Sequence, residues 1–118
     1  SLVEKEARFP EDRPIIAQVF FKRLDINMPL QTDTTIQYLL DGPKENLSIA
    51  DTKIDSPYNT YQHYGLPPGP IASPGMASIE AVLNPANTEY LYFVADTQGH
   101  NHYGYTYDEH LDLVDQVR

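Results

Sequence analysis

The segment that most constrains the fold is Gly65-Leu66-Pro67-Pro68-Gly69-Pro70, which places three prolines and two glycines within six residues. Each proline fixes its own φ angle and removes a backbone donor, whereas each glycine allows other groups to approach closely. Neither a helix interior nor a central strand can run through it. It lies in a turn-rich stretch, residues 25–75, and long irregular stretches inside compact domains often carry function. The simpler alternative is a rigid connector.

Helices are expected before and within this stretch. Residues 1–8 are helix formers, and Pro10 ends that helix or begins the next element. Apolar residues at helical spacing predict an amphipathic helix from about Glu11 to Leu24, with charges that suit its dipole. Two short segments, residues 34–40 and 48–51, each predict one or two helical turns.

The C-terminal part predicts a helix, a hairpin and a final helix. Ser73-Pro74-Gly75 resembles a helix cap with proline in the first turn, so we expect a helix over residues 76–83 that stops at Asn84-Pro85. The β-rich runs at residues 90–95 and 102–105 predict a β-hairpin. Thr106 and Glu109 have capping-box spacing before a last helix. A chain of 118 residues fits one domain, and its elements predict an α+β fold.

Composition excludes several functions. Acidic residues outnumber basic ones 17 to 8, the formal net charge is -9, and the basic residues are scattered, which argues against a nucleic-acid partner. The absence of cysteine rules out a disulfide framework, a thiolate nucleophile and a cysteine-based zinc site. No nucleotide or nucleophilic-serine motif is present, so we expect no cofactor. The longest nearly apolar run, residues 15–21, is too short to span a bilayer.

Two glutamates near the amino terminus are candidates for acid–base chemistry. Glu4 and Glu6 lie about 200° apart on a helix, so at most one points inward. Leu2 and Val3 are placed to desolvate Glu4 and raise its pKa, as a general acid requires. The alternative is a solvated helix face, and spacing alone does not choose Glu4.

The irregular stretch holds polar residues suited to binding sugars. Gln31 and Asp33 follow Pro29-Leu30, and Tyr58 and Asn59 follow Pro57. The alternative is turn formation and capping. The four histidines lack a metal-ligand spacing, so no metal site is expected and exposed or packing roles are favoured.

Several motifs together resemble the endolytic murein transglycosylases, the MltG or YceG-like proteins. In chain order these are Val3-Glu4-Lys5-Glu6, Val19-Phe20-Phe21-Lys22-Arg23-Leu24, Met28-Pro29-Leu30-Gln31-Thr32-Asp33, Tyr58-Asn59-Thr60-Tyr61, residues 65–75 with the proline–glycine segment, Asn84-Pro85-Ala86 and Tyr90-Leu91-Tyr92-Phe93-Val94-Ala95. They cover almost the whole chain in the family's order. The hairpin departs from the family pattern: His100, Asn101 and His102 occupy the stretch where a histidine is usual, and Tyr105 replaces a basic residue.

The resemblance implies a peptidoglycan lytic transglycosylase that cuts nascent glycan strands internally and leaves 1,6-anhydro ends. It implies that Glu4 is the catalytic acid/base, with Glu6 as its substitute, and that Gln31, Asp33, Tyr58 and Asn59 line the glycan groove. Residues 1–118 would be the catalytic domain, without the membrane anchor and LysM-like region that family members carry upstream. The implied partners are peptidoglycan strands and the peptidoglycan synthases. The implied location is the extracytoplasmic side of the bacterial cytoplasmic membrane.

Two rival functions remain open at this stage. One is a muramidase that uses water, with Asp33 as a second carboxylate. The other is a non-catalytic domain that binds or scaffolds the cell wall.

Overall fold

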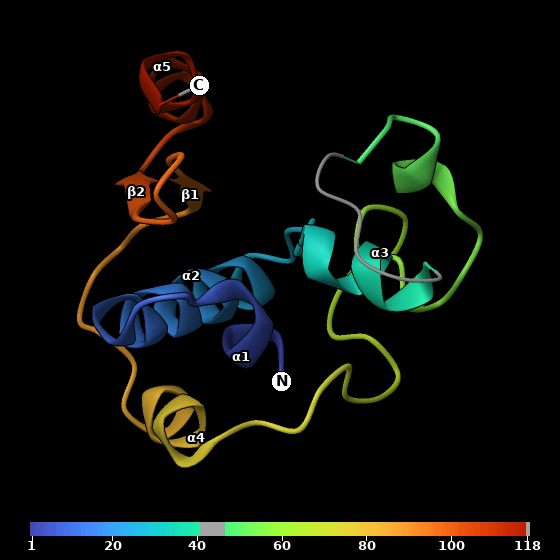
Figure 1. The fold of residues 1–118 in the computed structure, drawn as a ribbon, viewed down its shortest axis with the longest axis horizontal. Helices are drawn as coiled ribbons and strands as arrows, with labels where there is room; N and C mark the ends of the chain where they lie inside the picture. Colours follow the sequence, from blue (N-terminus) through green and yellow to red (C-terminus); the bar gives the residue numbers. More distant parts are fainter. Residues whose placement is uncertain (41–46, 118) are drawn as a thin grey trace.

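Helix α2 (Arg13–Asp25) carries much of the buried core, and the computed structural model describes residues 1–40 and 47–117. The helices α1 (Leu2–Glu6) and α4 (Met76–Leu83) lie against α2, and the hairpin with the last helix lies on another side (Figure 1). Ile16 and Val19 of α2 are completely buried. The short 3₁₀ helix η1 (Pro10–Asp12) leads into α2, so the predicted helix over residues 11–24 is confirmed with a tighter first turn.

Helix α1 has only five residues, too few to be stable alone. Its stability comes from burial, since Leu2 and Val3 are in the hydrophobic core with Ile16, Phe20 and Leu30. The backbone becomes extended at Ala7, which ends the helix before Pro10. The helix contacts α2, α3 and α4, so its side chains reach several elements at once.

Outside residues 41–46, the irregular stretch contains two helical pieces. Helix α3 (Asp33–Leu39) confirms the prediction for residues 34–40. The second piece is the 3₁₀ helix η2 (Asp51–Lys53), which begins where the predicted segment 48–51 ends. The displacement has a local cause: the Asp51 carboxylate accepts from Ser48 N at 2.9 Å and the Ser48 hydroxyl accepts from Asp51 N at 3.1 Å, so Ser48 caps the turn instead of joining it.

The proline–glycine segment, residues 65–70, passes close to the core. Its two glycines are favoured at their positions for different reasons. Gly65 has a φ of 81°, which favours glycine. A Cβ at Gly69 would lie 3.0 Å from the Tyr58 hydroxyl oxygen, so only glycine fits without a shift. The segment ends at the buried Ile71, whose N–H donates to the Ser1 hydroxyl at 3.1 Å. It therefore fastens the irregular stretch to α1.

Helix α4 begins at Met76 and ends at Leu83, with Asn84 as its C-cap, as the Asn84-Pro85 pair predicted. The predicted cap is wrong in its residues, because Gly75 holds the cap position and Pro74 lies before the helix. Gly75 has no side chain to cap α4, so a residue from elsewhere in the chain has to satisfy the first N–H groups.

Strands β1 (Tyr92–Ala95) and β2 (Asn101–Gly104) form the predicted antiparallel hairpin, with Tyr92 opposite Gly104. The last helix, α5 (Tyr107–Val117), packs on both strands. Its cap is as predicted, since Glu109 N donates to the Thr106 hydroxyl at 3.2 Å. Within the described residues, five α-helices and a two-stranded hairpin confirm the α+β class. No helix in residues 1–40 and 47–117 is both long and apolar enough to cross a membrane.

Arg23 of α2 links this helix to two other parts of the chain, near Leu30 and near Leu91. It is 6% exposed, and its guanidinium group donates to the carbonyl of Leu30 at 2.5 Å and to that of Leu91 at 2.8 Å. It thereby ties α2 to the start of the irregular stretch and to the approach to the hairpin. Neighbouring Lys22 pairs instead with Glu89 at the surface, at 2.9 Å.

We expect Arg23→Met to lower the free energy of unfolding by about 2–4 kcal/mol, because buried carbonyls lose charged donors. Urea denaturation followed by circular dichroism measures the change. Lys22→Met is the matched control, since an exposed ion pair contributes little. Equal effects of both substitutions would contradict this role of Arg23.

Candidate active site

A polar groove of about 370 Å³ lies between α1, the start of α3 and the hairpin with α5. Its walls carry carboxyl, amide, guanidinium, imidazole and phenol groups. The lining residues are Glu6, Arg23, Leu30, Gln31, Thr32, Asp33, Tyr61, Tyr92, Phe93, Val94, Ala95, Asn101, Tyr107, His110 and Val114. Several acid–base and hydrogen-bonding groups thus share one cavity large enough for part of a sugar chain.

Glu6 is a carboxyl group of this groove whose pKa is shifted by its surroundings. It is the last residue of α1, and its Oε1 accepts a short hydrogen bond from the Thr32 hydroxyl. The protein around the carboxyl group raises the pKa of Glu6, opposed by the Thr32 hydroxyl and reinforced by the nearby charge of Asp33. A carboxyl group with a raised pKa is better suited to general acid catalysis than an ordinary exposed glutamate.

Gln31 and Asp33 lie in the groove beside Glu6. Gln31 has a φ of 48°, an uncommon conformation for a residue with a side chain, and its N–H donates to the carbonyl of Thr60 at 3.2 Å. Asp33 is the first residue of α3, and its Oδ1 accepts from the Tyr61 hydroxyl. Burial raises the pKa of Tyr61, and the bond to Asp33 raises it further, so Tyr61 remains a donor.

The opposite wall is aromatic and comes from β1 and α5. Tyr92 stacks with His110 at 5.2 Å between ring centroids and contacts Tyr107 at 5.8 Å, and the Arg23 guanidinium lies 5.3 Å from the Tyr92 ring. Tyr107 is 58% exposed. Sequence reasoning missed these residues as site residues. The available signal was the spacing of Tyr107 and His110, which puts them on one face of a helix.

Glu4 lies in a different place. Its Oε1 accepts from Gly75 N at 2.5 Å and from the Ser78 hydroxyl at 3.2 Å, so its carboxylate caps the amino terminus of α4. These bonds, the first being the stronger, lower the pKa of Glu4. Glu4 lines neither the polar groove nor the apolar pocket described below. A carboxylate held in its charged form is suited to capping and poorly suited to donating a proton.

Tyr58 and Asn59 do not line the polar groove. Asn59 is fully buried, and its amide donates to the carbonyls of Thr52 and Ile54. Tyr58 packs against Tyr38 with ring centroids 5.2 Å apart. Their predicted contact with glycan stays a prediction, but the structure gives both side chains partners within the protein.

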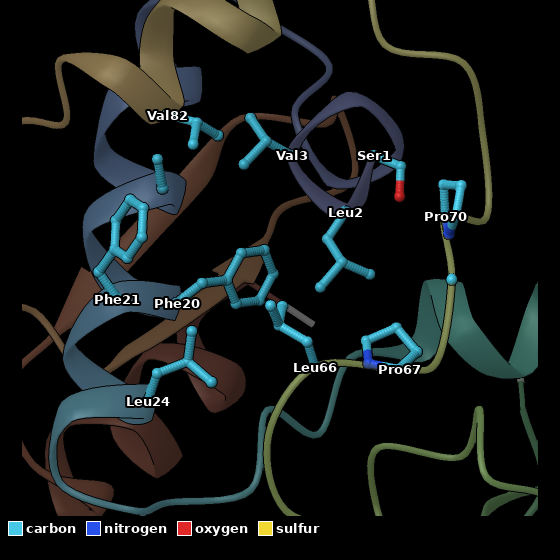
Figure 2. Close-up of a pocket in the computed structure, with 12 residues that line it drawn as sticks. Ser1, Leu2, Val3, Phe20, Phe21, Leu24, Leu66, Pro67, Pro70 and Val82 are labelled. Carbon is cyan, nitrogen blue, oxygen red and sulfur yellow. The ribbon is translucent and has the colours of Figure 1, made fainter.

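A second, apolar pocket of about 320 Å³ lies between α1, α2 and the proline–glycine segment (Figure 2). Leu2, Phe20 and Leu66 point into it, with Pro67 and Pro70 on the far side (Figure 2). No carboxyl or imidazole group lines it. The proline–glycine segment therefore frames a pocket without acid–base groups, and the polar groove is built by residues 30–33 and the C-terminal hairpin.

Two of the histidines are held by local contacts. His102 Nε2 lies 3.1 Å from Asp96 Oδ2, and the His100 ring stacks on Phe9 with centroids 4.1 Å apart. Within the part of the chain that the structure describes, no three His, Asp or Glu side chains are arranged to hold a metal ion.

A carboxyl group of raised pKa among amide, carboxylate and aromatic side chains is a candidate site for acid–base chemistry. The YceG-like family model matches residues 1–116, so the chain belongs to the YceG-like family.

Known relatives agree with this membership. An endolytic murein transglycosylase of Bacillus subtilis is 50% identical over 110 residues, which are 93% of this chain and 31% of that protein. An endolytic murein transglycosylase of Streptococcus pneumoniae is 46% identical over 116 residues, 93% of this chain and 21% of that protein. The crystal structure of a yceG-like protein from Listeria monocytogenes superposes with a TM-score of 0.90 at 47% identity, covering 96% of this chain and 37% of that one. The chain thus spans less than a third of the length of each of these two murein transglycosylases.

We expect Glu6→Gln and Glu4→Gln to change stability in opposite directions at pH 7. The raised pKa of Glu6 means that its stabilising contribution is present below about pH 4.5 and lost as pH rises through the folded-state pKa, so glutamine removes a penalty. The lowered pKa of Glu4 means that its contribution is present above about pH 4.5 and lost as pH falls, so glutamine destabilises. Urea denaturation at pH 7 measures both signs. The same sign for both variants would contradict the two environments described.

Proposed function

We propose that this chain is the catalytic part of an endolytic peptidoglycan lytic transglycosylase, with Glu6 as its acid/base. Membership of the YceG-like family and the activity for which two relatives are named support the reaction. The observation that carries the residue assignment is the position of Glu6: a desolvated carboxyl group in a polar groove beside Gln31 and Asp33. The substrate is the β-1,4 bond between N-acetylmuramic acid and N-acetylglucosamine.

One carboxyl group is sufficient for this reaction. Protonated Glu6 donates to the glycosidic oxygen as the bond from that oxygen to C1 of the muramic acid breaks. The 6-hydroxyl of the same muramic acid attacks C1 and passes its proton to the Glu6 carboxylate. The products are a 1,6-anhydro end and a free hydroxyl on the released sugar, and Glu6 regains its starting proton. Water takes no part, so no second carboxylate is needed to activate it.

The remaining groove residues orient the glycan. Gln31 supplies an amide for sugar hydroxyl and N-acetyl groups, and the Asp33 carboxylate lies on the same side to stabilise positive charge at C1. Tyr107 offers an exposed ring on the opposite wall, against which the apolar face of a sugar ring can stack. Tyr58 and Asn59 act indirectly, by shaping the loop that carries Tyr61.

The resemblance implies Glu4 as the catalytic acid, and in this proposal Glu4 is the alternative to Glu6. Its place at the amino terminus of α4 favours a structural role, because its charge is satisfied there by a backbone N–H and a hydroxyl. In this proposal the two glutamates have different roles. Glu4 links α1 to the amino terminus of α4, and Glu6 donates and accepts the proton.

The whole protein's setting follows from the same proposal. It acts in the bacterial cell envelope, on the extracytoplasmic side of the cytoplasmic membrane, on nascent peptidoglycan strands beside the peptidoglycan synthases. In this proposal the whole protein is anchored in that membrane, as the family resemblance implies.

Glu6→Gln should lower the formation of anhydromuramic ends at least about 100-fold, because a general acid contributes about 10²–10⁴ to the rate. Glu4→Gln, the matched control two residues away, should keep the rate within a few-fold once folding is verified. The measurement is mass spectrometry of peptidoglycan glycan strands after digestion. The reverse pattern would transfer the role to Glu4. Binding without cutting by the unaltered protein would favour a wall-binding domain.

Asp33 gives the muramidase alternative a specific test, because it shares the groove with Glu6. A water-using enzyme leaves reducing ends, whereas a transglycosylase leaves anhydro ends. We expect Asp33→Asn to slow cutting while every product keeps an anhydro end. Reducing ends that disappear in Asp33→Asn would identify hydrolysis with Asp33 as the second carboxylate.

A further inference from the structure

Three buried threonines, Thr32, Thr35 and Thr60, are joined by hydrogen bonds of threonine hydroxyl groups, and we call them the threonine cluster. Thr32 belongs to the motif Gln31-Thr32-Asp33 and Thr60 to the motif Tyr58-Asn59-Thr60-Tyr61, so the cluster joins the two motifs. The three residues are at most 3% exposed. The Thr60 hydroxyl accepts from Thr32 N at 3.0 Å and lies 2.9 Å from the Thr35 hydroxyl. The Thr35 hydroxyl donates to the Thr32 carbonyl at 2.9 Å. The backbone of Thr32 is therefore held on both its N–H and its carbonyl side.

The Thr32 side chain points from this cluster to Glu6. Its hydroxyl donates to Glu6 Oε1. The hydroxyl oxygens of Thr32 and Thr34 lie 2.8 Å apart. A threonine hydroxyl has a single proton, so when Thr32 donates to Glu6, Thr34 is the donor in the second contact. Thr34 also bonds the Glu6 carboxyl group through its hydroxyl and its N–H, and both bonds lower the pKa of Glu6 less than the Thr32 hydroxyl does.

We propose that Thr32 is a positioning residue, whose hydroxyl fixes one oxygen of the Glu6 carboxyl group, and that Thr35 and Thr60 act through Thr32. The inference rests on the proposed function, and it gives the buried part of the Tyr58–Tyr61 motif a role that needs no contact with glycan. A carboxyl group that must first donate and then accept a proton gains from a fixed orientation, since misplacement by an ångström costs much of the rate.

The other charged and titratable groups facing Glu6 come from separate elements. Asp33 of α3 and Arg23 of α2 line the same groove, with Tyr61 beside Asp33 and His110 on α5. All four are unchanged when Thr32 is replaced by the isosteric valine. A change in the titration of Glu6 in that variant therefore reports the loss of the hydroxyl.

The test is the titration of the Glu6 carboxyl carbon by ¹³C NMR, with the resonance assigned by its loss in Glu6→Gln. Loss of a hydrogen bond to a carboxylate disfavours the charged form, so Thr32→Val should move the titration midpoint upward by about one pH unit. Thr32→Ser keeps the hydroxyl and should restore the midpoint. Thr60→Val should move it in the same direction by less, and it keeps the test available should Thr32→Val fail to fold.

Thr88→Val is the matched control, because the Thr88 hydroxyl donates to Gln18 Oε1 at 2.8 Å, outside the groove. It should leave the midpoint in place. The alkaline limb of the pH profile for anhydro-end formation should follow the midpoint in each variant. An unmoved midpoint in folded Thr32→Val, or a serine variant that fails to restore it, would overturn the inference. A midpoint that moves while the activity limb stays would also overturn it, leaving a contact without a role in the reaction.

The titration needs no turnover, so the two proposals fail separately. Absence of anhydro ends from the unaltered protein rejects the proposed function. Normal cutting that is abolished in Glu6→Gln but keeps its pH profile in Thr32→Val rejects only the role of Thr32.

Discussion

The burial of α1 is the constraint on which the rest of the structure depends. A helix of five residues has no stability of its own, and Leu2 and Val3 hold it in the core against α2. Because the helix is fixed, the two glutamates that it carries reach different elements. Glu4 meets the amino terminus of α4, and Glu6 meets Thr32 just before α3. One short helix therefore supplies both a structural carboxylate and a candidate acid.

The fold was predictable where local patterns determine it. Helical periodicity identified α2, proline and asparagine placed the end of α4, and the Thr106 cap marked the start of α5. The start of α4 was not predictable in the same way. Its cap comes from Glu4, about seventy residues earlier, and no local pattern reveals a carboxylate supplied from such a distance.

The site was predictable only in part, for a related reason. Gln31 and Asp33 were expected in a groove and line one, and the backbone at Gln31 is left-handed. The choice between Glu4 and Glu6 depends on which side of α1 faces which element, and apolar neighbours in sequence do not decide that. Leu2 and Val3 are buried, but at Glu4 the hydrogen bonds from Gly75 and Ser78 outweigh desolvation and lower the pKa. The aromatic wall depends on the packing of α5 against the hairpin, which is also a tertiary fact.

The groove shows how this fold accommodates a group that opposes its stability. Placing Glu6 among protein atoms disfavours its charged form, and the nearby carboxylate of Asp33 adds to the penalty. The surroundings are rigid for independent reasons: the threonine cluster holds residues 32–35, and Arg23 holds Leu30 and Leu91 on either side. Stabilising bonds around the groove thus offset the cost of placing the Glu6 carboxyl group there. In the proposed function, the same bonds fix the direction in which that carboxyl group faces the substrate.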